Sequence, residues 1–126
     1  REIGAESCRL IFNINAEFAE QIAPRPLPVL AKSVIFSSMP DAICVSGGIT
    51  SQAVQTNSVA EVAEAIAGSG VPLLINTGFR ASNAADQLQY ADGAIVGSSL
   101  KQDGVTWNAV DAARVKELMA IVRRTE

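Results

Sequence analysis

Hydrophobic residues gather in four short runs along the chain, and none of the runs alternates regularly with polar residues. Each run is rich in Ile, Val, Leu or Phe; they are RLIFNIN (9–15), DAICVSG (41–47), VPLLINTG (71–78) and DGAIVGSS (92–99). Continuous apolar runs of this length, ending in Gly, Ser or Asn, are typical of strands buried on both faces of a parallel sheet. The pattern therefore predicts four buried strands.

Between the second and third runs, apolar residues repeat with helical spacing over residues 58–68. Ser58 and Glu61 stand at the spacing of a capping box, and Gly68 is a typical residue after a helix end. The apolar residues of this segment fall on one face; they are Val59, Val62, Ala63 and Ile66.

Three further segments predict helices. Residues 81–91 have Ser82 or Asn83 as the candidate cap, and their small apolar face consists of Ala84, Ala85 and Leu88. Residues 111–124 begin at Asp111 and repeat apolar side chains at Val115, Leu118, Met119 and Val122. Residues 28–39 are expected to turn Leu30, Val34 and Ile35 inward.

The predicted order is β-α-β-α-β-α-β-α, which implies parallel strands and right-handed crossovers. Two architectures fit this order: a small doubly wound sheet, or four consecutive units of a (β/α)₈ barrel. A complete barrel needs roughly 200 residues or more, so the chain supplies about half of one. In both architectures ligands bind at the carboxyl ends of the strands, where this chain places Asn, Ser, Thr and Gly.

Composition narrows the class of protein. Of 126 residues, 48% are hydrophobic and 18% are charged, which indicates a single core-forming domain, residues 1–126. The net charge is −3 and the cations form no basic stripe, so we expect no nucleic-acid partner. The cations near the end are typical of the last turns of a helix; they are Arg114, Lys116, Arg123 and Arg124.

Several absences matter as well. No signal peptide is visible, and every long uncharged run is interrupted, so we expect a cytoplasmic chain that does not span a membrane. The chain begins at Arg1 without Met, and we expect it to be a fragment. Cys8 and Cys44 lie in apolar stretches and are expected to be reduced core thiols. Histidine, the commonest general base and metal ligand, is missing from the sequence.

The segment YADGAIVGSSLKQDGVTWNAVDAARVKELMAIVRR resembles the carboxyl-terminal signature of the BtpA/SgcQ family, in which an ADGxIVGSSLKxDG strand precedes WNxVDxxRVxxL. The stretches DAICVSGGIT and VPLLINTGFRASNAADQLQYADG resemble earlier family segments, and the likeness covers residues 8–124. The resemblance implies a TIM barrel of the phosphate-binding type, of which this chain would supply strands five to eight. Cyanobacterial members are associated with photosystem I biogenesis, and bacterial members with sugar-metabolism genes.

The chain departs from the family after its first strand. The family carries an acidic residue, a histidine and a Lys-His pair there, whereas this chain has Asn13, Asn15, Glu17 and Phe18. Any activity that rests on that lysine or on those histidines cannot be carried over to this chain. The catalytic residues are therefore unknown, and Asn13, Asn15 and Glu17 are the candidates at these positions. The two amides can orient a substrate but cannot transfer protons near neutral pH.

The small residues at the carboxyl ends of the last two strands are the candidate phosphate site. Backbone N–H groups left accessible by small residues can surround a phosphate, and barrel phosphate sites use the loops after strands seven and eight. The candidate phosphate-binding residues are Thr77, Gly78, Phe79, Gly97, Ser98 and Ser99. The alternative is that Gly97 relieves crowding where a barrel closes.

Other polar residues near the strand ends are candidate substrate contacts: Ser46, Gly47, Thr50, Asn76, Arg80 and Lys101. The alternatives are an ordinary turn at Gly47 and solvated surface roles for Arg80 and Lys101. Cys44 lacks a histidine that could activate it, so a core role is favoured over a nucleophilic one. No cluster has metal-ligand spacing, and we expect no metal or cofactor.

Two functions remain open at this point. The first is a BtpA/SgcQ-like barrel, enzymatic or not, that binds a phosphorylated sugar or nucleotide metabolite. The second is a non-catalytic assembly or biogenesis factor that keeps the barrel without the chemistry. In both cases we expect the chain to pair with a missing half-barrel or with another copy of itself, because a half-barrel leaves open strand edges.

Overall fold

The computed structural model describes residues 3–19, 21–47 and 53–125. The four predicted strands form one parallel sheet in the order β1-β2-β3-β4, which confirms their number and direction. All are shorter than the apolar runs that contain them: β1 (Ile11–Asn13), β2 (Ala42–Val45), β3 (Leu73–Ile75) and β4 (Gly93–Ala94).

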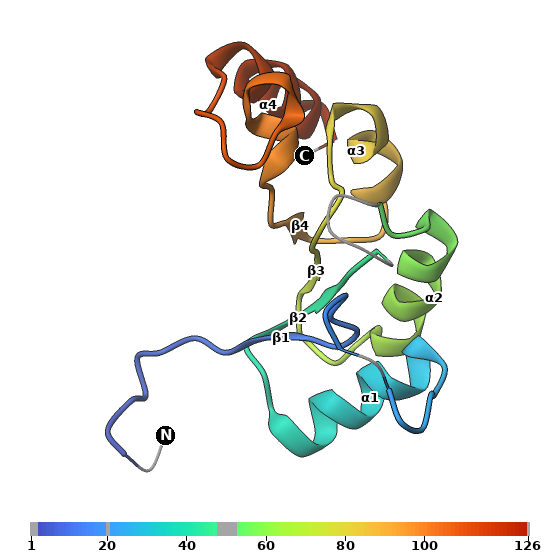
Figure 1. The fold of residues 1–126 in the computed structure, drawn as a ribbon. Helices are drawn as coiled ribbons and strands as arrows, with labels where there is room; N and C mark the ends of the chain where they lie inside the picture. Colours follow the sequence, from blue (N-terminus) through green and yellow to red (C-terminus); the bar gives the residue numbers. More distant parts are fainter. Residues whose placement is uncertain (1–2, 20, 48–52, 126) are drawn as a thin grey trace.

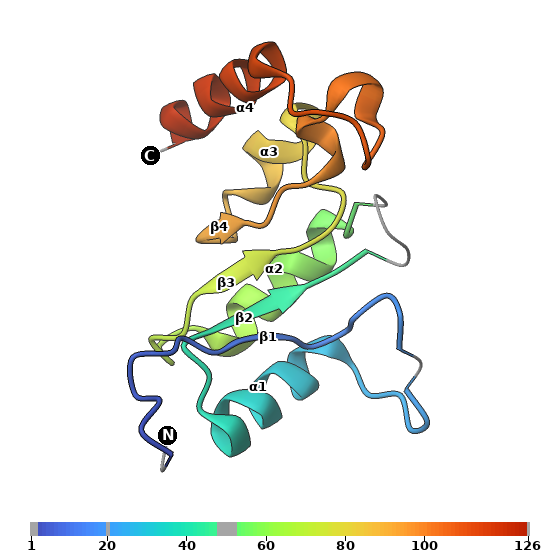
Figure 2. The same ribbon diagram turned by 60° about the vertical axis from the view of Figure 1, so that its left-hand side comes forward.

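Four α-helices alternate with the strands: α1 (Leu27–Ser38), α2 (Thr56–Ile66), α3 (Ala81–Gln87) and α4 (Ala112–Thr125). Two short 3₁₀ turns, η1 (Ser98–Leu100) and η2 (Gln102–Gly104), separate β4 from α4. The helices α1, α2 and α3 follow one another along one side of the sheet, and α4 packs beside α3 (Figures 1 and 2). The chain is therefore an α/β structure with a parallel sheet, as the alternating pattern predicts.

The strand register decides which residues enter the core. Ile43 pairs with Phe12 on one side and Leu73 on the other, and Val45 pairs with Ile75. The four aliphatic side chains of β2 and β3 at these positions are at most 1% exposed. They pack against the inner faces of the helices, where Val59, Val62, Ala84 and Leu118 are also buried.

The other face of the sheet carries the alternate residues of each strand. Ile11 on β1 is 49% exposed, and Ile95, just after β4, is 48% exposed. Figure 1 shows helices α1, α2 and α3 on the opposite side of the strands. Among the described residues, no helix lies over this face. In the described part of the chain, helices thus cover one side of the sheet only.

The last apolar run differs most from its prediction. Regular pairing in β4 ends at Ala94, although the Ile95 N–H still donates to the Ile75 carbonyl oxygen at 2.8 Å. Gly97 then has φ −122° and ψ −99°, and Ser98 begins the turn η1. The small residues therefore form a loop and a 3₁₀ turn and do not continue the strand.

The caps of α2 and α3 differ from prediction, because Gln55 and Arg80 precede these helices in place of Ser58 and of Ser82 or Asn83. Helix α2 begins at Thr56 after the extended residue Gln55, so Ser58 lies inside the first turn and the predicted capping box with Glu61 is wrong. Helix α3 begins at Ala81 and ends at Gln87, four residues before the predicted end. The side chain of Asn83 does assist this start, because its Oδ1 accepts the Arg80 N–H at 2.9 Å.

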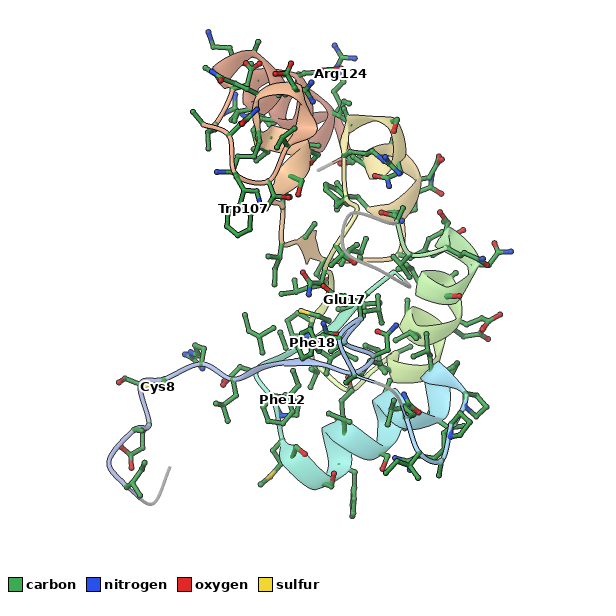
Figure 3. The ribbon with its side chains drawn as sticks, viewed as in Figure 1. Cys8, Phe12, Glu17, Phe18, Trp107 and Arg124 are labelled. Atoms are coloured by element: carbon green, nitrogen blue, oxygen red, sulfur yellow. The ribbon has the colours of Figure 1, made fainter. Side chains whose placement is uncertain are left out.

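Some predicted core positions need correction. Ala85 is exposed, and the buried residue of that helix beside Ala84 is Gln87, whose Nε2 donates to the Val54 carbonyl oxygen at 2.8 Å. Cys8 is exposed on the segment that precedes β1, which extends away from the sheet in Figure 3. The bond from Nε2 satisfies only part of the Gln87 amide, because its Oε1 is buried without a hydrogen-bond partner within the described part of the chain. Cys8 lies outside the core because the segment that carries it extends away from the sheet.

Candidate functional site

The loops after β3 and β4 line one cavity of about 760 Å³ at the carboxyl ends of these strands. The structure brings together there all six predicted phosphate-binding residues and three predicted substrate contacts: Thr77, Gly78, Phe79, Gly97, Ser98, Ser99, Asn76, Arg80 and Lys101. Parallel pairing of β3 with β4 explains this arrangement, because the carboxyl ends of parallel neighbours lie at the same edge.

The first loop has an unusual backbone. Gly78 has φ 74°, a conformation that glycine adopts without steric cost. Thr77 before it has φ 27°, which is unfavourable for a β-branched residue. Its hydroxyl accepts the Gly47 N–H at 3.1 Å, so this strained residue ties the loop after β3 to the end of β2. Outliers of this kind gather at ligand-binding sites.

Gly97 in the second loop is not required by packing within the described chain. A Cβ placed on it would have no atom within 4 Å. The space beside Gly97 is therefore open, as expected if a ligand group occupies it.

Side-chain hydrogen bonds hold the two loops in place. The Ser99 hydroxyl donates to the Phe79 carbonyl oxygen at 2.7 Å and so joins one loop to the other. The Ser98 and Thr106 hydroxyls lie 2.7 Å apart. Because these hydroxyls already have protein partners, the backbone amides are the better candidates for holding a ligand.

Several of those amides have no acceptor. The N–H groups of Gly78, Phe79, Gly97 and Ser99 form no backbone or side-chain hydrogen bond within the described part of the chain. Phe79 as a whole is only 3% exposed, so its N–H has little access to bulk water. Backbone donors in such positions are normally paired. Four unpaired donors around one cavity are suited to binding an anion.

The charges around the cavity favour an anion as well. Arg80, Lys101 and Arg114 line it, against the single carboxylate of Glu117. Arg114 Nη1 donates to the Ser99 carbonyl oxygen at 3.4 Å, and its Nε lies 3.8 Å from Asp111 Oδ2.

Arg114 is a site residue that the sequence interpretation missed. Grouped with Lys116, Arg123 and Arg124, it was expected in the last turns of the final helix, but it lies in the first turn of α4. Asp111, whose Oδ1 accepts the Ala113 N–H at 2.8 Å, marks that helix start in the sequence and was the signal available.

A second polar cluster joins the carboxyl ends of β1 and β2. Asn15 Oδ1 accepts the Ser46 N–H and Asn15 Nδ2 donates to the Ser46 carbonyl oxygen, both at 2.8 Å. Asn13 Nδ2 donates to the Ser46 hydroxyl at 2.7 Å. The Asn15 side chain thus extends the β1–β2 ladder by one pair. The three residues are not among those that line the large cavity, so their first role is to hold this rim together.

The remaining candidates lie apart from the cavity. Glu17 is half-buried and Phe18 is 86% exposed; both follow β1 beside the sheet in Figure 3. Gly47 does not line the cavity, but its N–H donates to the hydroxyl of Thr77, which does. Thr50 lies outside the described residues.

Cys44 is 2% exposed on β2, and burial raises the pKa of its thiol. This fits the predicted core thiol and not an activated nucleophile. In the described part of the chain, no three His, Cys, Asp or Glu residues gather where they could hold a metal ion. None of the described helices is long and apolar enough to cross a bilayer.

Comparison with known proteins agrees with the resemblance seen in the sequence. The family model described as the BtpA family matches residues 1–124. The sgc region protein SgcQ of Escherichia coli K12 is 38% identical over 117 residues, which cover 93% of this chain and 43% of SgcQ. Protein TK2179 of Thermococcus kodakarensis, itself uncharacterized, is 34% identical over 83 residues, 66% of this chain and 31% of that protein. The chain spans less than half the length of these relatives, and it belongs to the BtpA family.

Proposed function

We propose that this chain binds the phosphate group of a small phosphorylated metabolite, a sugar or a nucleotide, between the loops after β3 and β4. The observation that carries the proposal is the set of four backbone N–H groups around one cavity that have no acceptor in the described part of the chain. Gly97 leaves open space beside them, and the cavity lining contains three cationic side chains and one carboxylate.

Backbone donors supply most of the binding in this proposal. A hydrogen bond to a charged group contributes about 1.5–3 kcal/mol. Arg80 is exposed and Lys101 and Arg114 are partly exposed, so water weakens their attraction for an anion. We therefore expect modest affinity that depends more on the loop conformation than on any one cation.

We further propose that the chain forms strands five to eight of a (β/α)₈ barrel, as one domain of residues 1–126. The parallel sheet with helices along one side supports this, because a barrel needs its other side free to enclose the interior. The greater length of the relatives is consistent with four further β/α units.

A non-catalytic role, as an assembly or biogenesis factor, is the second candidate, and one observation favours it. The polar side chains at the β1–β2 rim, Asn13, Asn15 and Ser46, hydrogen-bond to one another. Amides cannot act as general acids or bases, and Glu17 stands where similar family members carry a lysine. The chain would then keep an anion site while its β1–β2 rim offers no acid or base for proton transfer.

Phosphate titration of the intact protein that carries this chain tests the proposal. We expect inorganic phosphate to shift the backbone amide resonances of Gly78, Phe79, Gly97 and Ser99, because their N–H groups are the proposed donors. Nuclear magnetic resonance of ¹⁵N-labelled protein measures these shifts residue by residue. Resonances that stay unchanged while phosphate binds elsewhere would contradict the proposal and leave Gly97 with a packing role.

Matched variants separate the backbone site from the cations. Gly97→Val should block phosphate by filling the open space, and Gly97→Ala should weaken it less. Lys101→Ala should lower affinity only about two- to fivefold, the effect of a partly screened charge. Lys116→Ala, which removes an exposed lysine that does not line the cavity, is the control and should leave affinity unchanged.

A further inference from the structure

Of the six polar backbone groups from Gly78 to Arg80, side chains bind three, and backbone N–H groups of α3 bind a fourth, the Arg80 carbonyl oxygen. Asn83 Nδ2 donates to the Gly78 carbonyl oxygen at 3.0 Å, while Asn83 Oδ1 accepts the Arg80 N–H at 2.9 Å. The Ser99 hydroxyl donates to the Phe79 carbonyl oxygen at 2.7 Å. The N–H of Gly78 and the N–H of Phe79 are left without a partner among the residues that the structure describes.

The geometry of the peptide unit determines where the Phe79 N–H points. The Gly78–Phe79 peptide is trans, so its carbonyl and its N–H point in opposite directions. Because the Asn83 amide holds the carbonyl, the N–H points away from Asn83. Phe79 lines the cavity, whereas Asn83 does not.

We infer that Asn83 is a positioning residue: its side-chain amide holds the Gly78–Phe79 peptide so that the Phe79 N–H donates to the bound anion. Ser99 assists by fixing the next carbonyl along the chain. This inference rests on the proposed phosphate site and adds a specific donor and the side chain that aims it. Asn83 stabilises the bound state without touching the ligand.

The opposing view is that Asn83 only starts helix α3. Its bond to the Arg80 N–H is the kind of contact that satisfies a helix end, but the bond to Gly78 lies outside the helix and serves no such purpose. The two roles therefore depend on different atoms of one side chain. Asn83→Asp keeps an oxygen for Arg80 and removes the donor to Gly78.

The test compares phosphate binding by the intact protein with Asn83→Ala, Asn83→Asp and Asn108→Ala. Asn108 is the matched control, since its Nδ2 also donates to a loop carbonyl oxygen, that of Gln102 at 3.1 Å, and it does not line the cavity. We expect both Asn83 variants to lower the affinity for phosphate roughly tenfold, about the loss of one hydrogen bond to a charged group. Asn108→Ala should bind like the unaltered protein.

Two measurements and one replacement variant distinguish the outcomes. The phosphate-induced shift of the Phe79 amide should shrink in both Asn83 variants, which a helix-starting role alone would not cause in Asn83→Asp. Raising the salt concentration should change the ratio of phosphate affinities between Asn83→Asp and the unaltered protein only slightly. A ratio that returns to one at high salt would assign the loss to the new charge and overturn the inference. If Asn83→Ala does not fold, Ser99→Ala replaces it and should weaken binding and move the same resonance.

Failure here is separate from failure of the proposed function. Unaltered protein that does not bind phosphate contradicts the phosphate site itself. Phosphate binding that is unchanged in the Asn83 variants leaves the site standing and refutes the positioning role.

Discussion

At the scale of single residues, the two cysteines have opposite environments. Cys44 is buried between neighbouring strands, and burial raises its thiol pKa because the thiolate loses solvation. Cys8 is exposed before β1. Since the thiolate is the reactive form, the two thiols should differ strongly in reactivity.

We expect iodoacetamide at pH 8 to alkylate Cys8 more than about tenfold faster than Cys44, because the buried thiol is shielded from the reagent and burial disfavours its thiolate. Mass spectrometry of timed samples measures both rates. In denaturing urea the rates should converge, which is the control. Equal rates in the folded protein would contradict the burial of the Cys44 thiol.

At the scale of elements, an aspartate joins the amino ends of neighbouring strands in two places. Asp41 Oδ2 accepts the Leu10 N–H at 2.8 Å, and Asp92 Oδ2 accepts the Leu73 N–H at 2.8 Å. In each pair the aspartate N–H also donates back to the partner's carbonyl oxygen. The Asp that opens DAICV and DGAIV therefore sets the strand register on the β1–β2 and β3–β4 borders.

Asp92→Ala should lower the free energy of unfolding by about 1–3 kcal/mol, since the Leu73 N–H would lose its acceptor where Leu73 is 1% exposed. Urea unfolding followed by circular dichroism measures the change. Asp86→Ala, at an exposed position of α3, is the control and should change stability by less than about 0.5 kcal/mol. Equal effects of the two substitutions would argue against the register role.

At the scale of the whole molecule, β1 and β4 are the edges of the sheet, and one face lacks a covering helix among the described residues. Ile11 and Ile95 at its two borders are about half exposed, at 49% and 48%. A second, smaller cavity of about 290 Å³ lies between β4, α3 and α4, with Leu88, Met119 and Val122 in its walls. Open edges beside apolar surface favour association.

Residues 1–126 expressed alone should therefore form dimers or larger assemblies, or pair with a second β/α half. Sedimentation velocity measures the mass. Ile11→Glu should weaken the association because it places a charge on the open face, whereas Val29→Glu, at a 52% exposed site on α1, should not. A compact monomer at all concentrations would contradict the half-barrel proposal.

The architecture was predictable because it depends on local patterns. Runs such as VPLLINTG specify a buried strand by their own composition, and the amphipathic face of α2, with Val59 and Val62 at 0% exposure, follows from spacing alone. The helix starts were less predictable. Ser58 has the right partner at Glu61, yet the chain enters α2 two residues earlier, at Thr56. Caps compete within one turn, and packing of the whole helix decides among them.

The sequence by itself determined the order of strands and helices, the parallel sheet and the small residues that mark the site, because these follow from the periodicity and size of neighbouring side chains. Only the tertiary structure decided which strand ends share a cavity. In the folded chain Ser99 bonds to Phe79 and Arg114 bonds to Ser99 at the cavity, whereas Asn15 bonds to Ser46 at the carboxyl ends of β1 and β2. These contacts link residues 15 to 31 positions apart, and such pairs form only once register and helix packing have placed both partners.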